Sequence, residues 1–355
     1  MRPDFSRYSC QIALPGFNKQ KQALLNRAKV LIIGAGGLGC PVALYLNAAG
    51  IGTIGIADYD VVSTSNLHRQ VLYGEDDLGQ KKAEVAIQLL EKQNHATKLI
   101  QHDVKVTSEN ILELIANYDV LVDCTDNFET RYLINDAAVI TCKPLIYGAI
   151  YQYEGQVAVW NVQNEEGKFS PNYRDLYPEV DATQIPNCAE GGVIPTLAGI
   201  IGCAQANEVI KLITKTAGLL EGKLFIFNAL NLESQVIKIG NVTRTIITQL
   251  KLTATIPYIS VKDLKQALED NSIQLFDIRT GEERDAYHIG GEHVILQKFE
   301  AFFESLPQDT KKVLYCASGK RSDEMVKTIK QKHPEANIFS LKGGLNAWIQ
   351  EKDIA

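Results

Sequence analysis

No two cysteines in this sequence have the C-x-x-C spacing. The 355-residue chain has seven cysteines, scattered and odd in number. The sequence therefore offers no obvious zinc knuckle, and a disulfide framework is not expected in a chain of this size. Reduced cysteines are typical of the cytoplasm, which is the localisation that we expect.

Long apolar segments are also scarce. The first residues, MRPDFSRYSCQ, lack the apolar core of a signal peptide. The most apolar stretch, GGVIPTLAGIIGCA at residues 191–204, stops at Gln205, Asn207 and Glu208. It is expected to be too short to span a bilayer and to form a buried helix. The formal net charge of -6 argues against nucleic-acid binding. We therefore expect neither a membrane nor a nucleic acid as partner.

What the chain does have is an alternation of short apolar runs with helical patterns. The expected strands of the first half are KVLII, TIGIAD, KLIQHDV and DVLVDCTD. This alternation predicts an α/β fold with a Rossmann-like, mostly parallel sheet covered by helices. The segments YEGQVAVWN and GKLFIFNALNLESQVIKIG are expected to add antiparallel strands to that sheet.

The same alternation restarts near the end of the chain. A threonine-rich segment without clear periodicity, residues 241–257, is interpreted as a linker. It separates a first domain, 1–240, from a small second α/β domain, 258–355. The chain length suits two domains.

The first domain contains a glycine motif that is typical of nucleotide sites. GAGGLG at residues 34–39 is a G-x-G-x-x-G made by Gly34, Gly36 and Gly39, with Gly37 in addition. It follows an expected strand and opens an expected helix, so the backbone can approach phosphate oxygens at a helix N-terminus. Asp58 ends the next strand, close to the spacing at which an acid binds ribose hydroxyls. A tight turn without a ligand is the alternative.

The residues that follow favour a triphosphate over a nicotinamide. Asn66, Arg69 and Lys82 come after the second strand, and cationic side chains neutralise charge that grows during nucleotidyl transfer. Lys82 alone could be a solvated helix lysine. Asp123 and Asp126 end another strand, where a carboxylate could hold Mg²⁺ against phosphates. Asp126 could also cap the following helix. A nicotinamide oxidoreductase is the disfavoured alternative.

Five ordered motifs carry a resemblance to a known family. GAGGLG, DYDVVSTSNLHRQ, GQKKAE, DCTDNFETR and CAEGGVIPTLAGIIG resemble the ubiquitin-activating-type adenylyltransferases, over about residues 5–240. Most similar are the bacterial enzymes that activate sulfur-carrier proteins for molybdopterin and thiamine synthesis. The resemblance implies a homodimer and the use of ATP with transient Mg²⁺. The ATP-binding residues that it implies are Gly37, Asp58, Ser65, Asn66, Arg69, Lys82, Asp126 and Asn127, with Arg69 and Asp126 also catalytic.

The resemblance also implies that Cys188 is a reactive cysteine, although a small buried thiol is the alternative. Two positions depart from the family. NYRD at residues 172–175 stands where many relatives have the first of two C-x-x-C zinc pairs, and no second pair follows. Cys10 stands where an arginine would reach the neighbouring subunit's triphosphate, while Arg7 remains.

The second domain contains a cysteine loop, YCASGKRS at residues 315–322. Cys316 and Arg321 form a C-x-x-G-x-R loop, shorter than that of a cysteine phosphatase and better suited to a sulfane sulfur. Backbone N–H groups and Arg321 should stabilise the thiolate, and a persulfide anion formed on it. With FDIRTGEERDAYHIGG and LKGGLNAW, residues 258–355 resemble a single-domain rhodanese. An inactive rhodanese fold used for docking is the alternative.

The two sites fit one reaction, in which sulfur replaces an oxygen of a carboxylate. A persulfide will not displace oxide from a carboxylate, whereas AMP on that carboxylate is a good leaving group. We therefore expect adenylation of the C-terminal glycine of a ubiquitin-like sulfur carrier ending in Gly-Gly, and its conversion to a thiocarboxylate. Sulfur would come from a persulfide donor such as a cysteine desulfurase, through Cys316. Cys188 would either hold the acyl group or resolve an acyl-disulfide. The molybdopterin-synthase carrier is favoured over the thiamine carrier, and a non-catalytic carrier-binding scaffold is a third hypothesis.

Purified protein should contain no bound zinc, because the chain has no C-x-x-C pair and NYRD replaces the first one. Elemental analysis of the full chain measures this, with a zinc-binding relative purified in parallel as the control. Stoichiometric zinc would mean that other residues supply the ligands.

Overall fold

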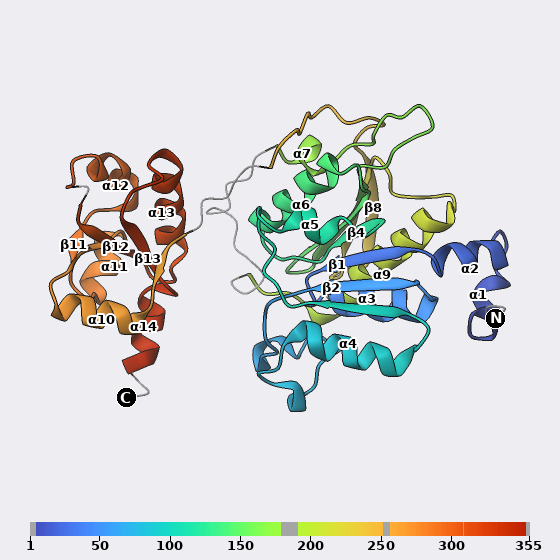
Figure 1. Cartoon of the computed structure of the whole chain (residues 1–355), viewed down its shortest axis with the longest axis horizontal. Helices are drawn as coiled ribbons and strands as arrows, with labels where there is room; N and C mark the ends of the chain where they lie inside the picture. Colours follow the sequence, from blue (N-terminus) through green and yellow to red (C-terminus); the bar gives the residue numbers. More distant parts are fainter. Residues whose placement is uncertain (1–4, 179–190, 251–255, 308, 353–355) are drawn as a thin grey trace. The chain divides into compact units, whose positions relative to one another are not determined.

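The structure is a computed structural model that describes residues 5–178, 191–250, 256–307 and 309–352 (Figure 1). The chain divides into two compact units, Met1–Lys251 and Leu252–Ala355.

The first unit is built on an eight-stranded sheet with the order β3-β2-β1-β4-β5-β6-β7-β8. The strands are β1 (Lys29–Ile33), β2 (Thr53–Ala57), β3 (Lys98–His102), β4 (Val120–Asp123), β5 (Leu145–Tyr151), β6 (Glu154–Trp160), β7 (Lys223–Asn228) and β8 (Glu233–Lys238). Strands β1 to β5 run parallel, and β6, β7 and β8 pair antiparallel. The predicted parallel sheet with antiparallel additions is confirmed.

Helices cover both faces of this sheet. Val30 and Ile32 of β1 belong to one hydrophobic cluster with α3 (Gly39–Ala49), α4 (Lys82–Gln93) and α9 (Pro195–Thr214). Leu31 and Ile33 belong to a second cluster with α5 (Ile111–Ile115), α6 (Phe128–Ile140) and α7 (Tyr173–Leu176). A strand buried on both faces needs an apolar run rather than alternation, which explains KVLII. The remaining elements are η1 (Ser6–Tyr8), α1 (Ser9–Ile12), α2 (Lys19–Leu25), η2 (Thr64–Asn66) and η3 (Glu75–Asp77).

Helix α9 contains the apolar stretch of the sequence and is longer than expected. By length and composition alone, it could cross a membrane, so the argument that this stretch is too short was wrong. The expected burial is confirmed, because α9 packs against α3, β5 and β6. Leu197, Ile201 and Val209 are fully buried there.

The second unit is a five-stranded parallel sheet with the order β11-β10-β12-β13-β9. Its strands are β9 (Tyr258–Ile259), β10 (Ile273–Asp277), β11 (Glu292–His293), β12 (Lys311–Tyr315) and β13 (Ile338–Leu341). Its helices are α10 (Val261–Glu269), α11 (Gly281–Ala286), α12 (Leu296–Phe303), α13 (Lys320–Lys332) and α14 (Gly344–Lys352). The two sheet faces pack into separate hydrophobic clusters. The predicted small second α/β domain is confirmed.

Residues 243–245, which belong to the predicted linker, are bound to the first unit. The Thr243 hydroxyl donates to Asp175 Oδ2 at 2.6 Å and accepts from Asn172 Nδ2 at 2.9 Å. The same amide donates to Thr245 Oγ1 at 2.5 Å. We call Asn172, Asp175, Thr243 and Thr245 the polar clasp. Asn172 and Asp175 are the first and last residues of the NYRD segment. At the position where the family pattern would place a pair of zinc ligands, side-chain hydrogen bonds therefore bind this segment to residues 243–245.

Replacing Thr243 with valine should destabilise the first unit, because Asp175 and Asn172 would lose a partly buried hydrogen-bond partner. A loss of about 1–3 kcal/mol is expected for such unsatisfied groups. Thermal unfolding followed by calorimetry measures it as a lower transition temperature. Thr243→Ser keeps the hydroxyl and is the matched control. Equal transitions for valine and serine would contradict a stabilising role for the polar clasp.

Candidate active sites

The first site forms where β1, β2 and β4 end at one edge of the sheet. Ile33 lies opposite Ala57 on one side and opposite Asp123 on the other. The N–H of Gly34 donates to Ala57 O, and that of Cys124 donates to Ile33 O, each at 2.9 Å. The glycine loop is therefore fixed between the loops that follow β2 and β4.

Two positions of the loop require glycine. Gly34 has φ +97°, and a Cβ there would lie 2.7 Å from the carbonyl oxygen of Cys124. A Cβ at Gly39 would overlap the carbonyl oxygen of Gly34. The close approach of loop and helix leaves the first turn of α3 facing the loop, as the predicted phosphate site requires.

Asp58 ties the end of β2 to this loop. Its carboxylate accepts from Ala35 N at 2.7 Å and from Asp60 N at 2.8 Å. Burial raises the pKa of Asp58. The structure thus places Asp58 beside the glycine loop, as its predicted ribose contact requires.

The predicted polar and cationic residues gather near the same loop. The aliphatic part of Arg69 lies 3.5 Å from where a Cβ of Gly37 would be, and Arg69 Nη1 donates to Ser65 O at 3.3 Å. Asn66 accepts from the hydroxyl of Ser63 at 2.9 Å.

Lys82 is the first residue of α4 and is buried. Its Nζ pairs with the Asp60 carboxylate at 3.1 Å. The alternative of a solvated helix lysine is therefore wrong, and Asp60 is a residue that sequence reasoning missed.

The two acids after β4 have different surroundings. Asp123 is fully buried and binds Thr125 and Arg131, so it is not free to hold a metal. Asp126 is exposed. The alternative of Asp126 as the cap of α6 is wrong, because Asn127 Oδ1 accepts from Thr130 N at 2.9 Å in that role. Asp126 remains the exposed carboxylate of the pair.

Tyr73 is a second residue that sequence reasoning missed. Its hydroxyl lies 2.8 Å from Ala35 O and 3.3 Å from Lys82 O, and burial raises its pKa. It therefore joins the glycine loop to the start of α4. Nothing in the sequence distinguishes such a hydroxyl from an ordinary core ring.

The residues of this site fit a nucleotide. Gln70 is buried with its Nε2 3.6 Å from where a Cβ of Gly36 would be. Among the described residues, its Oε1 has no hydrogen-bond partner. A buried polar atom without a partner beside a glycine loop is what a ligand-binding site can contain before its ligand is bound.

In the second unit, the cysteine loop joins β12 to α13 and is backed by α14. Leu345 N donates to Cys316 O and Asn346 N donates to Ala317 O, each at 2.9 Å. A Cβ at Gly344 would overlap the loop backbone, which explains the glycine pair of LKGGLNAW. Loop carbonyls are thus turned toward α14.

The same loop also offers backbone donors. Gly319 has φ +93° and precedes the first turn of α13. Within the described part of the chain, the N–H groups of Ala317, Ser318 and Gly319 donate to no recorded acceptor. Successive N–H groups of this kind form a cradle for an anion.

Cys316 is buried, with 1% of the residue exposed. The Ser322 hydroxyl lies 3.7 Å from its sulfur and accepts from Ser340 Oγ at 2.8 Å. Both serines are fully buried. Ser322 directly follows Arg321 in the sequence, and its contact with the sulfur was not predicted.

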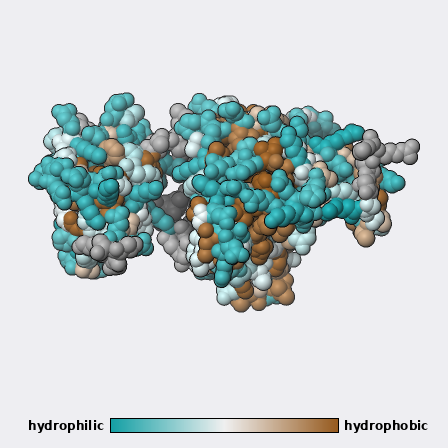
Figure 2. Space-filling view, turned by 60° about the horizontal axis from the view of Figure 1, so that its bottom comes forward, coloured by the Kyte–Doolittle hydropathy of each residue, from teal (hydrophilic) through white to brown (hydrophobic). Residues whose placement is uncertain are grey.

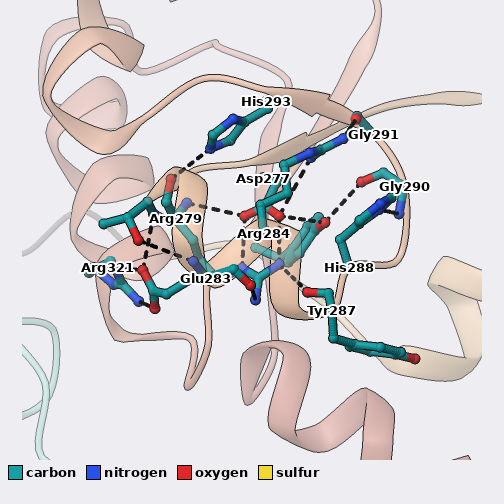
Figure 3. A network of polar contacts seen from close by, with 12 residues as sticks. Asp277, Arg279, Glu283, Arg284, Tyr287, His288, Gly290, Gly291, His293 and Arg321 are labelled. Carbon is teal, nitrogen blue, oxygen red and sulfur yellow. Dashed lines mark hydrogen bonds and ion pairs between the residues drawn. The ribbon is translucent and has the colours of Figure 1, made fainter.

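Arg321 pairs with a carboxylate near the cysteine loop. Its guanidinium donates to Glu283 at 2.8 Å and 2.5 Å (Figure 3). This pair lowers the pKa of Glu283 to about 2, and Arg321 also interacts with the Cys316 thiol. Arg321 further borders a cavity of about 280 Å³ with Ile278, Thr280 and Leu296.

A buried network of Asp277 and Arg279 lies beside this pair (Figure 3). Arg279 donates twice to Asp277, at 2.9 Å and 2.7 Å, and Tyr315 donates to the same carboxylate at 2.9 Å. Burial raises the pKa of Tyr315 to about 12. His288 is exposed and accepts from Gly290 N at 3.0 Å, so it contributes a local turn.

The predictions for Cys188 and for zinc remain predictions. Cys188 belongs to residues 179–190, which lie outside the described residues. Within residues 5–178, 191–250, 256–307 and 309–352, no group of three or more His, Cys, Asp or Glu side chains could hold a metal ion.

Comparison with known proteins defines the class. The ThiF family matches residues 8–245, and a rhodanese-like domain matches residues 260–351. The chain therefore belongs to the ThiF family and carries a rhodanese-like domain. It is an enzyme of the adenylyltransferase class with a fused sulfurtransferase domain.

Individual relatives have the same two-part organisation. The chain is 37% identical to a probable adenylyltransferase/sulfurtransferase, MoeZ, of Mycobacterium tuberculosis, over 99% of this chain and 94% of the relative. It is 36% identical to the adenylyltransferase and sulfurtransferase MOCS3 of Xenopus laevis, over 99% and 87%. The crystal structure of E. coli MccB shares the fold of the first unit, with a TM-score of 0.61 and 21% identity over 70% of this chain and 73% of that one.

Tyr73→Phe should weaken binding of ATP, because the glycine loop and the start of α4 would lose their shared hydrogen bond. One such bond contributes about 1 kcal/mol, or roughly fivefold in affinity. Calorimetric titration of the full chain with ATP measures it. Tyr118→Phe removes a hydroxyl that bonds His102 at 2.7 Å instead and should leave affinity unchanged. If both variants bind ATP with the same affinity, Tyr73 does not contribute to the ATP site.

Proposed function

We propose that this enzyme adenylates the C-terminal glycine of a ubiquitin-like sulfur-carrier protein and converts it to a thiocarboxylate. The observation that carries the proposal is the presence of two built sites on one chain. One is a glycine loop with cations around it, and the other is a cysteine in a cradle of backbone donors. Carboxylate activation needs the first and sulfur delivery needs the second.

In the first reaction, the carrier's C-terminal carboxylate attacks the α-phosphorus of ATP, and pyrophosphate leaves. ATP supplies the leaving group that the carboxylate lacks. The glycine loop, Asn66, Arg69 and Lys82 would hold its phosphates, and Asp58 its ribose. Asp126 is the exposed carboxylate near the strand ends that could hold Mg²⁺. In that reaction, Lys82 would exchange its pairing with Asp60 for phosphate oxygens.

In the second reaction, the terminal sulfur of a Cys316 persulfide attacks the acyl carbon of the carrier adenylate. A C–S bond forms, the C–O bond to AMP breaks, and AMP leaves with the electron pair. A second thiol, which we assign to Cys188, then attacks the Cys316 sulfur and releases the thiocarboxylate. The Cys188–Cys316 disulfide is reduced by an external thiol. The cradle of N–H groups and Arg321 would hold the sulfur anion of Cys316 at the start and end of this sequence.

The carrier and a second copy of the chain both need a surface on the first unit. Apolar residues are exposed over part of that unit (Figure 2). Strand β8 is exposed along its whole length, and Leu230 and Leu232 are each 72% exposed. Large exposed apolar side chains support a protein interface. Among carriers, we favour the molybdopterin-synthase small subunit over the thiamine carrier, and a reducing cytoplasm as the compartment, with a cysteine desulfurase as sulfur donor.

A rhodanese domain that serves only for docking is the competing hypothesis. It would need neither the cradle of N–H groups nor the pairing of Arg321 beside the thiol. The Ser322 hydroxyl and the Arg321 guanidinium near the Cys316 sulfur favour a reactive cysteine, because both can stabilise a sulfur anion.

Cys316→Ala should separate the two reactions. The variant should retain ATP–pyrophosphate exchange with the carrier, because no predicted nucleotide residue lies in the second unit. It should lose thiosulfate:cyanide sulfurtransfer and persulfide-dependent thiocarboxylate formation, measured by intact-mass analysis of the carrier. Asp126→Ala is the matched control, with exchange lost and sulfurtransfer to cyanide retained.

Free sulfide should partly rescue Cys316→Ala, since a small nucleophile can reach the acyl-adenylate by itself. Thiocarboxylate formation at the wild-type rate by Cys316→Ala with a persulfide donor would support the docking hypothesis instead. Absence of exchange in the wild type with any carrier ending in Gly-Gly would contradict the adenylation step.

A further inference from the structure

The Glu283–Arg321 pair stands out because one guanidinium is shared between a carboxylate and the reactive sulfur. Two hydrogen bonds, at 2.8 Å and 2.5 Å, join Arg321 to both oxygens of Glu283. Such fork-to-fork geometry is the strongest form of an ion pair. Each of the two side chains is about one-third exposed, so the pair lies at the surface of the loop while the sulfur lies beneath it.

Glu283 also forms hydrogen bonds at the start of its own helix, α11. It is the third residue of α11, where its carboxylate accepts from Thr280 N at 3.0 Å and its N–H donates to Thr280 Oγ1 at 3.3 Å. Its carbonyl accepts from Arg279 at 3.1 Å. The capping box and the buried arginine together leave the carboxylate little freedom to follow Arg321.

These contacts link Arg321 to the residue that precedes the cysteine. Arg279 is bound to Asp277, which accepts from Tyr315, and Tyr315 directly precedes Cys316 (Figure 3). The path returns through Glu283 and Arg321 to the thiol. Glu283 therefore binds the same guanidinium that interacts with the thiol.

The charge of Glu283 also matters to the sulfur. A lone guanidinium beside a thiol strongly favours the thiolate. With Glu283 bound to it, Arg321 belongs to a neutral pair, and its field at the sulfur is weaker. A sulfur anion that is stabilised less has a higher pKa and is the better nucleophile, with a sensitivity of about 0.4–0.5 per pKa unit.

We propose that Glu283 is a positioning residue for sulfur transfer, which acts through Arg321 and balances its charge so that the sulfur anion of Cys316 stays nucleophilic. This rests on the proposed role of Cys316 as the sulfur carrier. In the sequence, Glu283 belongs with Asp277, Arg279 and His288 to the segment FDIRTGEERDAYHIGG, which supports the rhodanese resemblance, and nothing there pairs it with Arg321.

Glu283→Gln tests the proposal in the full chain, since it removes the charge and retains the shape. The rate of Cys316 alkylation by iodoacetamide is followed against pH by peptide mass spectrometry, because other cysteines also react. Among the described residues, the charged or titratable groups near the loop include Asp277, Arg279, Arg284, His293, Tyr315, Lys320 and Asp323.

The midpoint of this profile should fall by roughly 0.5–1 unit in Glu283→Gln, because Arg321 is no longer balanced. The rate at the alkaline plateau should fall about two- to threefold, as expected for a thiolate of lower pKa. Thiosulfate:cyanide sulfurtransfer, in which sulfite leaves and cyanide then removes the outer sulfur, should fall in parallel at that pH.

Glu282→Gln is the matched control, because it removes an exposed acid from the neighbouring position and should behave as wild type. Glu283→Asp keeps the charge one methylene further away and should give an intermediate midpoint. If Glu283→Gln does not fold, as thermal unfolding would show, the direction of the Glu283→Asp shift decides.

An unchanged or raised midpoint in the Glu283 variants would overturn the proposal. Neither assay uses ATP or a carrier, so the result is independent of the adenylation step. A wild type that alkylates but transfers no sulfur would contradict the sulfur-carrier role of Cys316, while the alkylation profile would still decide the role of Glu283.

Discussion

Both sites depend on one constraint, which is that parallel strands end at the same edge of their sheet. In the first unit, Ile33 lies opposite Ala57 and Asp123, so the glycine loop, Asp58 and Asp126 follow neighbouring strand ends. In the second unit, Asp277 lies opposite Tyr315. The loop of Cys316 therefore begins beside the residues that hold Arg279. Polar groups distant in sequence meet at these edges because the apolar cores fix the strand registers.

This constraint explains what could be predicted from the sequence. Apolar runs such as KVLII and the glycine signals identify strands and loops, and their order then implies which loops meet. Pairings between side chains do not follow from such patterns. Nothing in the sequence indicates that Asp123 forms a buried ion pair with Arg131 while Asp126 stays exposed. Nor does it indicate that Lys82 is buried and pairs with Asp60. The sequence analysis did not predict strand β5. Its sequence LIYGAIY is apolar throughout, so it shows no alternation of apolar and polar residues, and its central glycine is unfavourable in a strand.

The two sites differ in how they treat charge. Around the glycine loop, Lys82 is paired with Asp60, an acid that is itself half exposed, so the cation can turn to a phosphate when one is bound. Around the cysteine, Arg321 is bound by both oxygens of Glu283, which is held by its own helix. The first arrangement suits binding of a highly charged substrate. The second suits a sulfur that must be held as an anion and then released to an acceptor.

The most direct test of the account follows one sulfur atom from Cys316 to the carrier. The full chain is loaded with a heavy-isotope persulfide on Cys316, freed of donor, and mixed with carrier in a single turnover. The account predicts that the labelled sulfur appears in the carrier's C-terminal thiocarboxylate when Mg-ATP is present and stays on the enzyme when it is absent. Labelled carrier without ATP, or thiocarboxylate that contains no label, would contradict the account.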